Sequence, residues 1–234
     1  IPGIDGPDII RGIEYLRVLC VEEEWKIKDT MVVIGGGNVA FDVARSSLRN
    51  GAKKVTMVCL ESRDEQTADE FEIEDGIEEG IDLINRLSPI AVERDANGNI
   101  TGLRVQRISS LFDHNGRFSP KLIPDTQFVI PCNTVALAIG QATDMGFLDG
   151  WDKKDQLVVD RGIVKTERGT GRTTVPKIYS GGDVAFGPAL FITAIRHGQE
   201  AARAIDADLM HTAPYQEFVG EFTQVNPMRD KEYL

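Results

Sequence analysis

The chain has 234 residues, 41% of them hydrophobic, which is enough for one large or two modest domains with a buried core. Its formal net charge of −11 argues against a nucleic-acid-binding surface, and no apolar run approaches the ~20 residues needed to cross a bilayer. Three widely separated cysteines, Cys20, Cys59 and Cys132, suggest neither a disulfide framework nor a metal knuckle, favour a reducing cytoplasm, and form no Cys-x-x-Cys dithiol.

The first stretch, IPGIDGPDIIRG, lacks the basic start and apolar centre of a signal peptide. A helix is predicted from Asp8 to about Glu24, because apolar residues recur there at threes and fours. Since a domain more often begins with its first strand, we expect residues 1–28 to be a connecting segment from something upstream.

Residues 31–45, MVVIGGGNVAFDVAR, predict a buried strand, a tight turn and the start of an amphipathic helix. Gly35, Gly37 and Ala40 fill the G-x-G-x-x-G/A positions of a dinucleotide-binding turn. Gly35 lets the chain reverse, Gly37 leaves room for a pyrophosphate, and Ala40 lets the helix press onto the strand. The free N–H groups of the helix start, around Gly36, Asn38 and Val39, then face the phosphates.

A second buried strand is predicted from Val55 to Leu60, after Asn50-Gly51 closes the helix. Glu61 follows 21 residues after Ala40, about where such folds place the acid that binds the adenosine ribose 2′-OH. A carboxylate there repels a 2′-phosphate, so Glu61 favours NAD(H) over NADP(H). Arg63 argues mildly the other way, since a guanidinium pairs well with that phosphate. The alternative is that Glu61, Ser62 and Arg63 are solvated residues at a strand end.

The acidic stretch from Asp69 to Asp82 is predicted to be a surface helix, because Ile73, Ile77 and Ile81 repeat every four residues. We prefer this interpretation to a metal site. Between Ile90 and Ile130, turns at Asn97-Gly98 and Asn115-Gly116 separate apolar segments and predict an antiparallel meander.

A further buried strand, Thr134 to Ile139, ends at Gly140-Gln141, where the glycine either brings the backbone close to a nicotinamide or simply turns the chain. Beyond an irregular crossing at Phe147 to Lys154, a short hairpin is predicted from Leu157 to Thr166, and Gly169-Thr170-Gly171 is a loop. KIYSGGDV, from Lys177, predicts a strand, and Gly187-Pro188 is predicted to open a helix.

Three segments together, VVIGGGNVAFDVAR, ALAIGQ and VPKIYSGGDVAFGPALFITAIRHGQEAA, resemble flavin-dependent pyridine-nucleotide oxidoreductases, in particular those similar to the glutamate synthase small subunit. The resemblance covers roughly Ile1 to Asp206 in the correct order. It implies an α/β fold: a Rossmann-like parallel sheet with an antiparallel β-meander insert, followed by a partial FAD-binding α/β segment. The expected domains are 29–146 for NAD(P), 147–210 for the C-terminal part of the FAD domain, and a tail at 211–234.

The resemblance also implies the sites. Residues 35–40 would bind the NAD(P) pyrophosphate, and Ile139, Gly140 and Gln141 would lie near the nicotinamide. Gly182 and Asp183 would hold the FAD ribityl chain and phosphates. The segment of Pro188, Ala189, Leu190 and on to Ala194 would place a helix N-terminus at the flavin pyrimidine edge.

Two departures from the family pattern shape the expected function. Leu60-Glu61 stands where glutamate synthase small subunits have paired arginines, and the FAD-binding glycine turn expected upstream is absent. We therefore expect a fragment, inactive in isolation, of an enzyme that passes hydride from NAD(P)H to FAD and electrons to an iron–sulfur partner. No catalytic side chain and no metal ligand is expected. The alternative is a non-catalytic NAD-binding sensor or assembly module, and a disulfide reductase is disfavoured because no dithiol is present.

Overall fold

The computed structural model describes residues 1–21, 27 and 29–213. The chain divides into two compact units, Ile1–Gln141 and Ala142–Leu234. None of the helices within the described residues combines the length and apolarity needed to cross a lipid bilayer. The part of the predicted tail beyond residue 213 and residues 22–24 of the first predicted helix lie outside the described residues.

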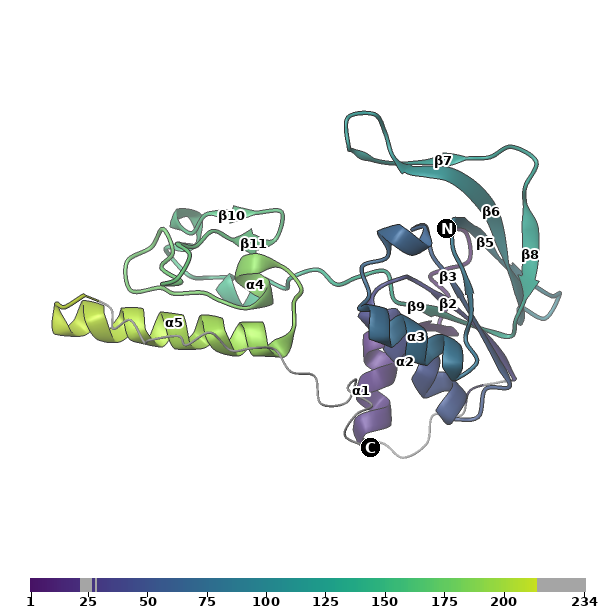
Figure 1. Ribbon diagram of the computed structural model, residues 1–234, viewed down its shortest axis with the longest axis horizontal. Coiled ribbons are helices and arrows are strands. Elements are labelled where there is room, and N and C mark those ends of the chain that lie inside the picture. Colours follow the sequence, from purple (N-terminus) through teal and green to yellow (C-terminus); the bar gives the residue numbers. More distant parts are fainter. Residues whose placement is uncertain (22–26, 28, 214–234) are drawn as a thin grey trace, which may run out of the picture. The chain divides into compact units, whose positions relative to one another are not determined.

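A five-stranded parallel sheet forms the centre of the first unit (Figure 1). Its spatial order is β1-β9-β2-β3-β4, and every neighbouring pair is parallel. The strands are β1 (Ile9–Arg11), β2 (Thr30–Ile34), β3 (Lys54–Val58), β4 (Asp82–Ile84) and β9 (Thr134–Leu137). The predicted α/β class and the three predicted buried strands are therefore confirmed, although β3 and β9 each end two residues earlier than expected.

The helix predicted to begin at Asp8 begins later, because residues Ile9–Arg11 form the strand β1. Ile9–Arg11 pairs with β9 in the register Ile9↔Val135, and the helix α1 (Gly12–Val21) begins only afterwards. Ile9 and Ile10 are β-branched and fit a pleated sheet, so the pairing with β9 overrides the helical spacing of the apolar residues. The segment predicted to be a connection thus supplies an edge strand of the sheet.

The two faces of the sheet are covered differently, as the alternation of side chains along β2 requires. Met31 and Val33 pack with residues of α1, α2 (Asn38–Arg49) and α3 (Glu70–Glu78), among them Tyr15, Phe41 and Ile73. Val32 and Ile34 pack instead with Leu87, Leu103 and Val105 of the antiparallel strands. The helices and the antiparallel insert therefore bury opposite faces of one sheet (Figure 1).

The predicted antiparallel meander is confirmed between residues 87 and 131. Its strands are β5 (Leu87–Arg94), β6 (Ile100–Phe112), β7 (Phe118–Leu122) and β8 (Phe128–Pro131), and β6 pairs with each of the other three. Gly98 (φ +84°) and Gly116 (φ +72°) sit in the two predicted turns, in the left-handed conformation that favours glycine.

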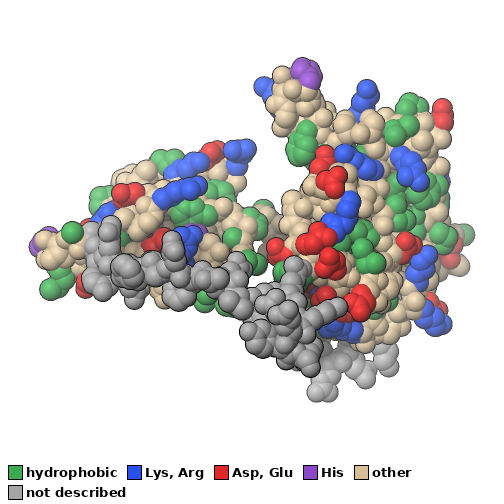
Figure 2. Space-filling model, viewed as in Figure 1, with side chains coloured by type: hydrophobic (Ala, Val, Ile, Leu, Met, Phe, Trp, Pro, Cys, Tyr) green, Lys and Arg blue, Asp and Glu red, His purple; other side chains and the backbone are tan. Residues whose placement is uncertain are grey.

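The acidic helix is confirmed as a surface element, but it is shorter than predicted and several of its carboxylates form ion pairs. α3 ends at Glu78, and Asp82 already belongs to β4. Arg45 of α2 forms ion pairs with Glu72 (2.6 Å) and Glu79 (2.8 Å). Figure 2 shows acidic and basic side chains mixed over this face of the first unit. Ile77, predicted to lie on the apolar face, is 51% exposed, whereas Ile73 is buried.

Among its described residues, the second unit has a short hairpin and two α-helices. β10 (Val159–Asp160) and β11 (Ile163–Val164) form the predicted hairpin, and residues 169–171 form the predicted loop. The elements around them are the 3-10 turns Gly146–Leu148 and Lys154–Gln156, α4 (Asp183–Phe186) and the long α5 (Phe191–Met210).

Two predictions for the second unit are wrong. KIYSGGDV is not a strand, because Tyr179 makes only an isolated bridge with Arg172. Pro188 does not lie in a first helical turn, since α5 begins at Phe191 with Leu190 as its N-cap. A strand needs a neighbouring strand to pair with, and the described residues supply only that single bridge to this segment.

Candidate functional site

The glycine turn lies between β2 and α2, at the carboxyl edge of the parallel sheet. Gly35 has φ +146°, and a Cβ built on it would lie 2.3 Å from the carbonyl oxygen of Ala138. Its N–H donates to the Val58 carbonyl (2.9 Å), and Ala40 is completely buried. Both positions therefore need small residues where three chain segments approach closely, as the sequence predicted for Ala40, whereas Gly35 was predicted only to let the chain reverse.

The N-terminus of α2 is open where the turn meets it. Gly37 is the N-cap and offers no side-chain cap, and a Cβ on it would meet only the Thr67 hydroxyl at 3.5 Å. The Asn38 side chain makes two hydrogen bonds with Asp69. Asn38 Nδ2 donates to Asp69 Oδ2 (2.9 Å), and the Asp69 N–H donates to Asn38 Oδ1 (2.8 Å). The first N–H groups of a helix have no partner inside it, so the backbone at Gly37, Asn38 and Val39 can receive an anion.

Glu61 reaches this turn from the end of β3. A Cβ on Gly36 would lie 3.0 Å from Glu61 Oε2 and 2.9 Å from Cys59 Cβ, so the carboxylate rests against the glycine backbone. The structure thus brings together the glycine turn and the acid that the sequence placed beside it.

The residues that follow Glu61 are engaged with one another. Ser62 is half-buried and is the N-cap of a 3-10 turn, Arg63–Glu65. Arg63 forms an ion pair with Glu70. Arg86, from the chain after β4, forms another with Glu65 (3.0 Å). These guanidinium groups are therefore paired with carboxylates beside the turn.

Two polar side chains near Glu61 escaped the sequence analysis. Cys59 is buried at the end of β3, and Asn85 donates from Nδ2 to Cys59 Sγ (3.2 Å) and to the Glu61 carbonyl (3.1 Å). Burial, followed by the nearby Glu61 charge, raises the pKa of Cys59 to about 11. In the sequence, Cys59 lies in the predicted strand Val55 to Leu60, and no predicted element placed Asn85 beside it.

The three thiols are expected to differ sharply in reactivity. A pKa of about 11 leaves roughly 0.03% of Cys59 as thiolate at pH 7.5, and burial raises the pKa of Cys132 to about 11 as well. Cys20 is exposed. Native chain treated with Ellman's reagent at pH 7.5 should therefore lose one thiol rapidly, whereas chain unfolded in guanidinium should lose all three. Rapid loss of a second thiol from the folded chain would contradict the buried positions.

Residues 139–141 follow β9 at the same edge of the sheet. Ile139 is 70% exposed, and Gly140 has φ +101° with open space on the side where a Cβ would stand. Ala138 N–H donates to the Ile34 carbonyl, which fixes this strand end beside Gly35. Ile139, Gly140 and Gln141 therefore continue from the glycine turn as an exposed edge.

Among the predicted site residues of the second unit, Gly182 lies against Ala194. This glycine has φ +64°, its N–H donates to Nδ1 of His197 (3.2 Å), and a Cβ on it would contact the Cβ of Ala194 at 3.4 Å. Asp183 begins α4, while Pro188, Ala189 and Leu190 precede α5. His197 is buried against Phe186, with ring centroids 4.2 Å apart, so it holds the glycine turn in place.

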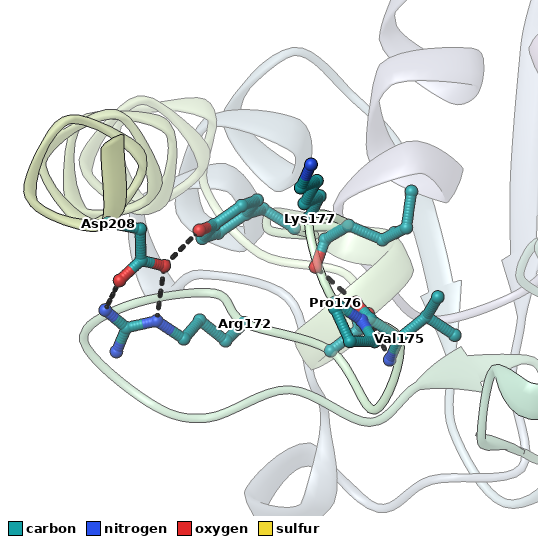
Figure 3. A pocket seen from close by; sticks show the side chains of 8 residues that line it. Arg172, Val175, Pro176, Lys177 and Asp208 are labelled. Carbon is teal, nitrogen blue, oxygen red and sulfur yellow. Dashed lines mark hydrogen bonds and ion pairs between the residues drawn. The ribbon is translucent and has the colours of Figure 1, made fainter. Parts of the chain in front are cut away.

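A separate hollow of about 340 Å³ in the second unit contains none of the predicted residues (Figure 3). Asp208 of α5 points to Arg172, which binds it through two nitrogens at 2.6 and 2.9 Å, and Tyr179 donates to the same carboxylate. Arg172, with Tyr179, lowers the pKa of Asp208 to about 2. These charges satisfy one another and fasten α5 to the segment before Gly182.

The family described as pyridine nucleotide-disulphide oxidoreductase matches residues 1–198. The beta subunit of the NADP(+)-dependent formate dehydrogenase of Moorella thermoacetica is 37% identical over 214 residues, which cover 87% of this chain and 29% of that subunit. The glutamate synthase [NADPH] small chain of Escherichia coli (strain K12) is 32% identical over 183 residues, 75% of this chain and 38% of that one.

Among solved structures, the thioredoxin reductase of T. acidophilum superposes with a TM-score of 0.67 at 21% identity, covering 90% of this chain and 61% of that one. This likeness supports the α/β fold. The chain spans about a third of the length of the formate dehydrogenase and glutamate synthase relatives.

Proposed function

The chain belongs to the pyridine nucleotide-disulphide oxidoreductase family, and from that premise we propose that it binds NAD(P)H and contributes to an FAD site of a flavin-dependent oxidoreductase. The glycine turn at residues 35–40 holds the coenzyme pyrophosphate in this proposal. Residues 139–141 lie at the nicotinamide, at the same edge of the sheet. The observation that carries the proposal is the Glu61 carboxylate against Gly36, at the open start of α2.

We propose that the coenzyme is NAD(H) in preference to NADP(H). Glu61 can accept hydrogen bonds from the two ribose hydroxyls, whereas it would repel a 2′-phosphate. Arg63, two residues after Glu61, and Arg86, whose N–H donates to the Glu61 carbonyl, form ion pairs with Glu70 and Glu65. The names of the formate dehydrogenase and glutamate synthase relatives carry NADP(+) and NADPH, so a direct comparison of the two coenzymes is the decisive measurement.

The flavin is assigned to the second unit. Gly182 and Gly187 both have positive φ (+64° and +83°), so the backbone around Asp183 can approach a ligand closely. The residues at the start of α5 are open, since Leu190 is 56% exposed and provides no side-chain cap. We propose that Gly182 and Asp183 hold the ribityl chain and phosphates, and that Pro188 to Ala194 face the pyrimidine edge.

The chemistry comes from the cofactors, since nicotinamide C4 donates a hydride and flavin N5 accepts it. The contribution of this chain is to orient and to stabilise charge. The positive end of α2 binds the diphosphate, and the N-terminus of α5 favours negative charge at the flavin pyrimidine. No side chain of the described sites is required to move a proton.

We further propose that electrons leave through an iron–sulfur protein or domain in the cytoplasm. The relatives are named as a beta subunit and a small chain, which supports a multi-component enzyme. The three free cysteines agree with a reducing compartment.

Calorimetric titration of the chain with each coenzyme tests the proposed site. We expect micromolar-class binding of NADH, about tenfold weaker binding of NADPH, and displacement of NADH by ADP-ribose, which contains the half that contacts residues 35–40 and Glu61. No binding of either coenzyme at ~1 mM would overturn the proposal.

A further inference from the structure

The chain after β4 runs beside the chain after β3, although the two strands themselves have ended. Val58 pairs with Ile84, and the next hydrogen bonds continue the pairing. The backbone N–H of Cys59 donates to the Ile84 carbonyl (3.3 Å), and the backbone N–H of Leu87 donates to the Cys59 carbonyl (2.9 Å). This extension keeps Asn85 within reach of the residues that carry Glu61.

The Asn85 amide bridges both ends of the Cys59-Leu60-Glu61 segment. Its Nδ2 lies 3.2 Å from Cys59 Sγ and 3.1 Å from the Glu61 carbonyl oxygen. The same carbonyl accepts from the Arg86 N–H at 3.2 Å and from the Cys59 thiol at 3.6 Å. The backbone of Glu61 is thus held by three donors, of which Asn85 provides the shortest bond.

The position of the Glu61 carboxylate depends on that backbone. A Cβ atom added to Gly36 would lie 3.0 Å from the Glu61 Oε2 and 2.9 Å from the Cβ of Cys59. Cys59 and Glu61 therefore both lie against Gly36, and the Asn85 amide is hydrogen-bonded to both residues.

We propose that Asn85 is a positioning residue that sets the preference for NAD(H) over NADP(H), because it holds Glu61 at the adenosine ribose. This inference rests on the proposed function, which gives Glu61 its role. An amide suits the position, since it donates to the sulfur and to the carbonyl at once. A carboxylate of the same shape could donate to neither when ionised, and would add negative charge beside Glu61.

The test uses Asn85→Asp, which keeps the shape of the side chain, and Asn85→Ala, which removes it. Affinities for NADH and NADPH are measured by calorimetry for both variants, for Glu61→Ala, and for the double variant Asn85→Ala/Glu61→Ala. Asn99→Ala is the matched control, because Asn99 also loses amide hydrogen bonds, to Asp95 in the β5–β6 turn.

We expect Asn85→Ala to weaken NADH binding about five- to tenfold and to change NADPH binding less than about twofold. Asn85→Asp should weaken NADH binding to a similar extent and should weaken NADPH binding as well, because its added charge repels the 2′-phosphate. The double variant should bind NADH no more weakly than Glu61→Ala, because Asn85 acts through Glu61. Asn99→Ala should bind both coenzymes as the unaltered chain does. Thermal melting checks that each variant is folded.

An equal loss for both coenzymes in Asn85→Ala, or failure of both Asn85 variants to fold, would show that Asn85 only supports the fold and would overturn the inference. If Glu61→Ala weakens NADH binding but the Asn85 variants do not, the inference fails while the proposed ribose site stands. If Glu61→Ala changes neither affinity, the proposed role of Glu61 is itself wrong.

Discussion

Replacing Gly35 with alanine is expected to abolish measurable NADH binding and to cost at least about 3 kcal/mol of unfolding free energy. The new Cβ would lie 2.3 Å from the carbonyl oxygen of Ala138 and 2.9 Å from its carbon, both of them backbone atoms that cannot rotate away. The residue would also need φ +146°, which side chains disfavour. The chain would relieve the contact only by separating β9 from the turn. Calorimetry and urea unfolding measure the two effects.

Substitutions of two other glycines distinguish a loss of stability from a loss of NADH binding. Gly98 has φ +84° but open space around it, so Gly98→Ala should cost only about 1 kcal/mol and leave NADH binding unchanged. Gly37 has φ −94° and one ordinary contact, so Gly37→Ala should remain stable yet bind NADH more weakly, since the added carbon would face the proposed pyrophosphate position. A stable Gly35→Ala chain with full NADH affinity would remove the turn from the site.

Replacing Glu61 with arginine should reverse the coenzyme preference. We expect NADH binding to weaken about tenfold and NADPH binding to strengthen about tenfold, because a guanidinium cannot accept ribose hydrogen bonds but pairs with a 2′-phosphate. The ratio of the two dissociation constants, measured by calorimetry, would then change about a hundredfold.

Glu78→Arg provides the matched control, since it makes the same change of charge at an exposed position of α3. It should leave the preference where it was, because a solvent-exposed charge away from the ligand is screened by salt. If Glu61→Arg also leaves the preference unchanged, Glu61 does not contact the ribose.

The parts of the fold that could be predicted are those written in short, local patterns. The run from Met31 to Ile34 has no polar residue, and three glycines follow it, so a buried strand and turn were evident. Asn50-Gly51 and the two Asn-Gly turns likewise specify their backbone locally. The roles of the individual site residues remain predictions.

The parts that could not be predicted depend on distant partners. Ile9–Arg11 becomes a strand because β9, more than 120 residues later, lies beside it, whereas its own spacing is helical. Residues 177–180 have strand-like composition but make only one bridge, so the strand predicted from their composition was wrong. Asn85 meets Glu61 across 24 residues and Arg172 meets Asp208 across 36, and no local motif announces either contact.

The loop that carries Glu61 is fastened at both ends before any ligand arrives. Asn38 and Asp69 join the start of α2 to the residue before α3, and Asn85 with Arg86 holds the other end. Because these hydrogen bonds already hold the loop in place, the loop would lose little conformational entropy when a ligand binds. The proposed coenzyme preference could therefore change through the side chain of residue 61 alone, because these anchors hold its backbone and not its carboxylate.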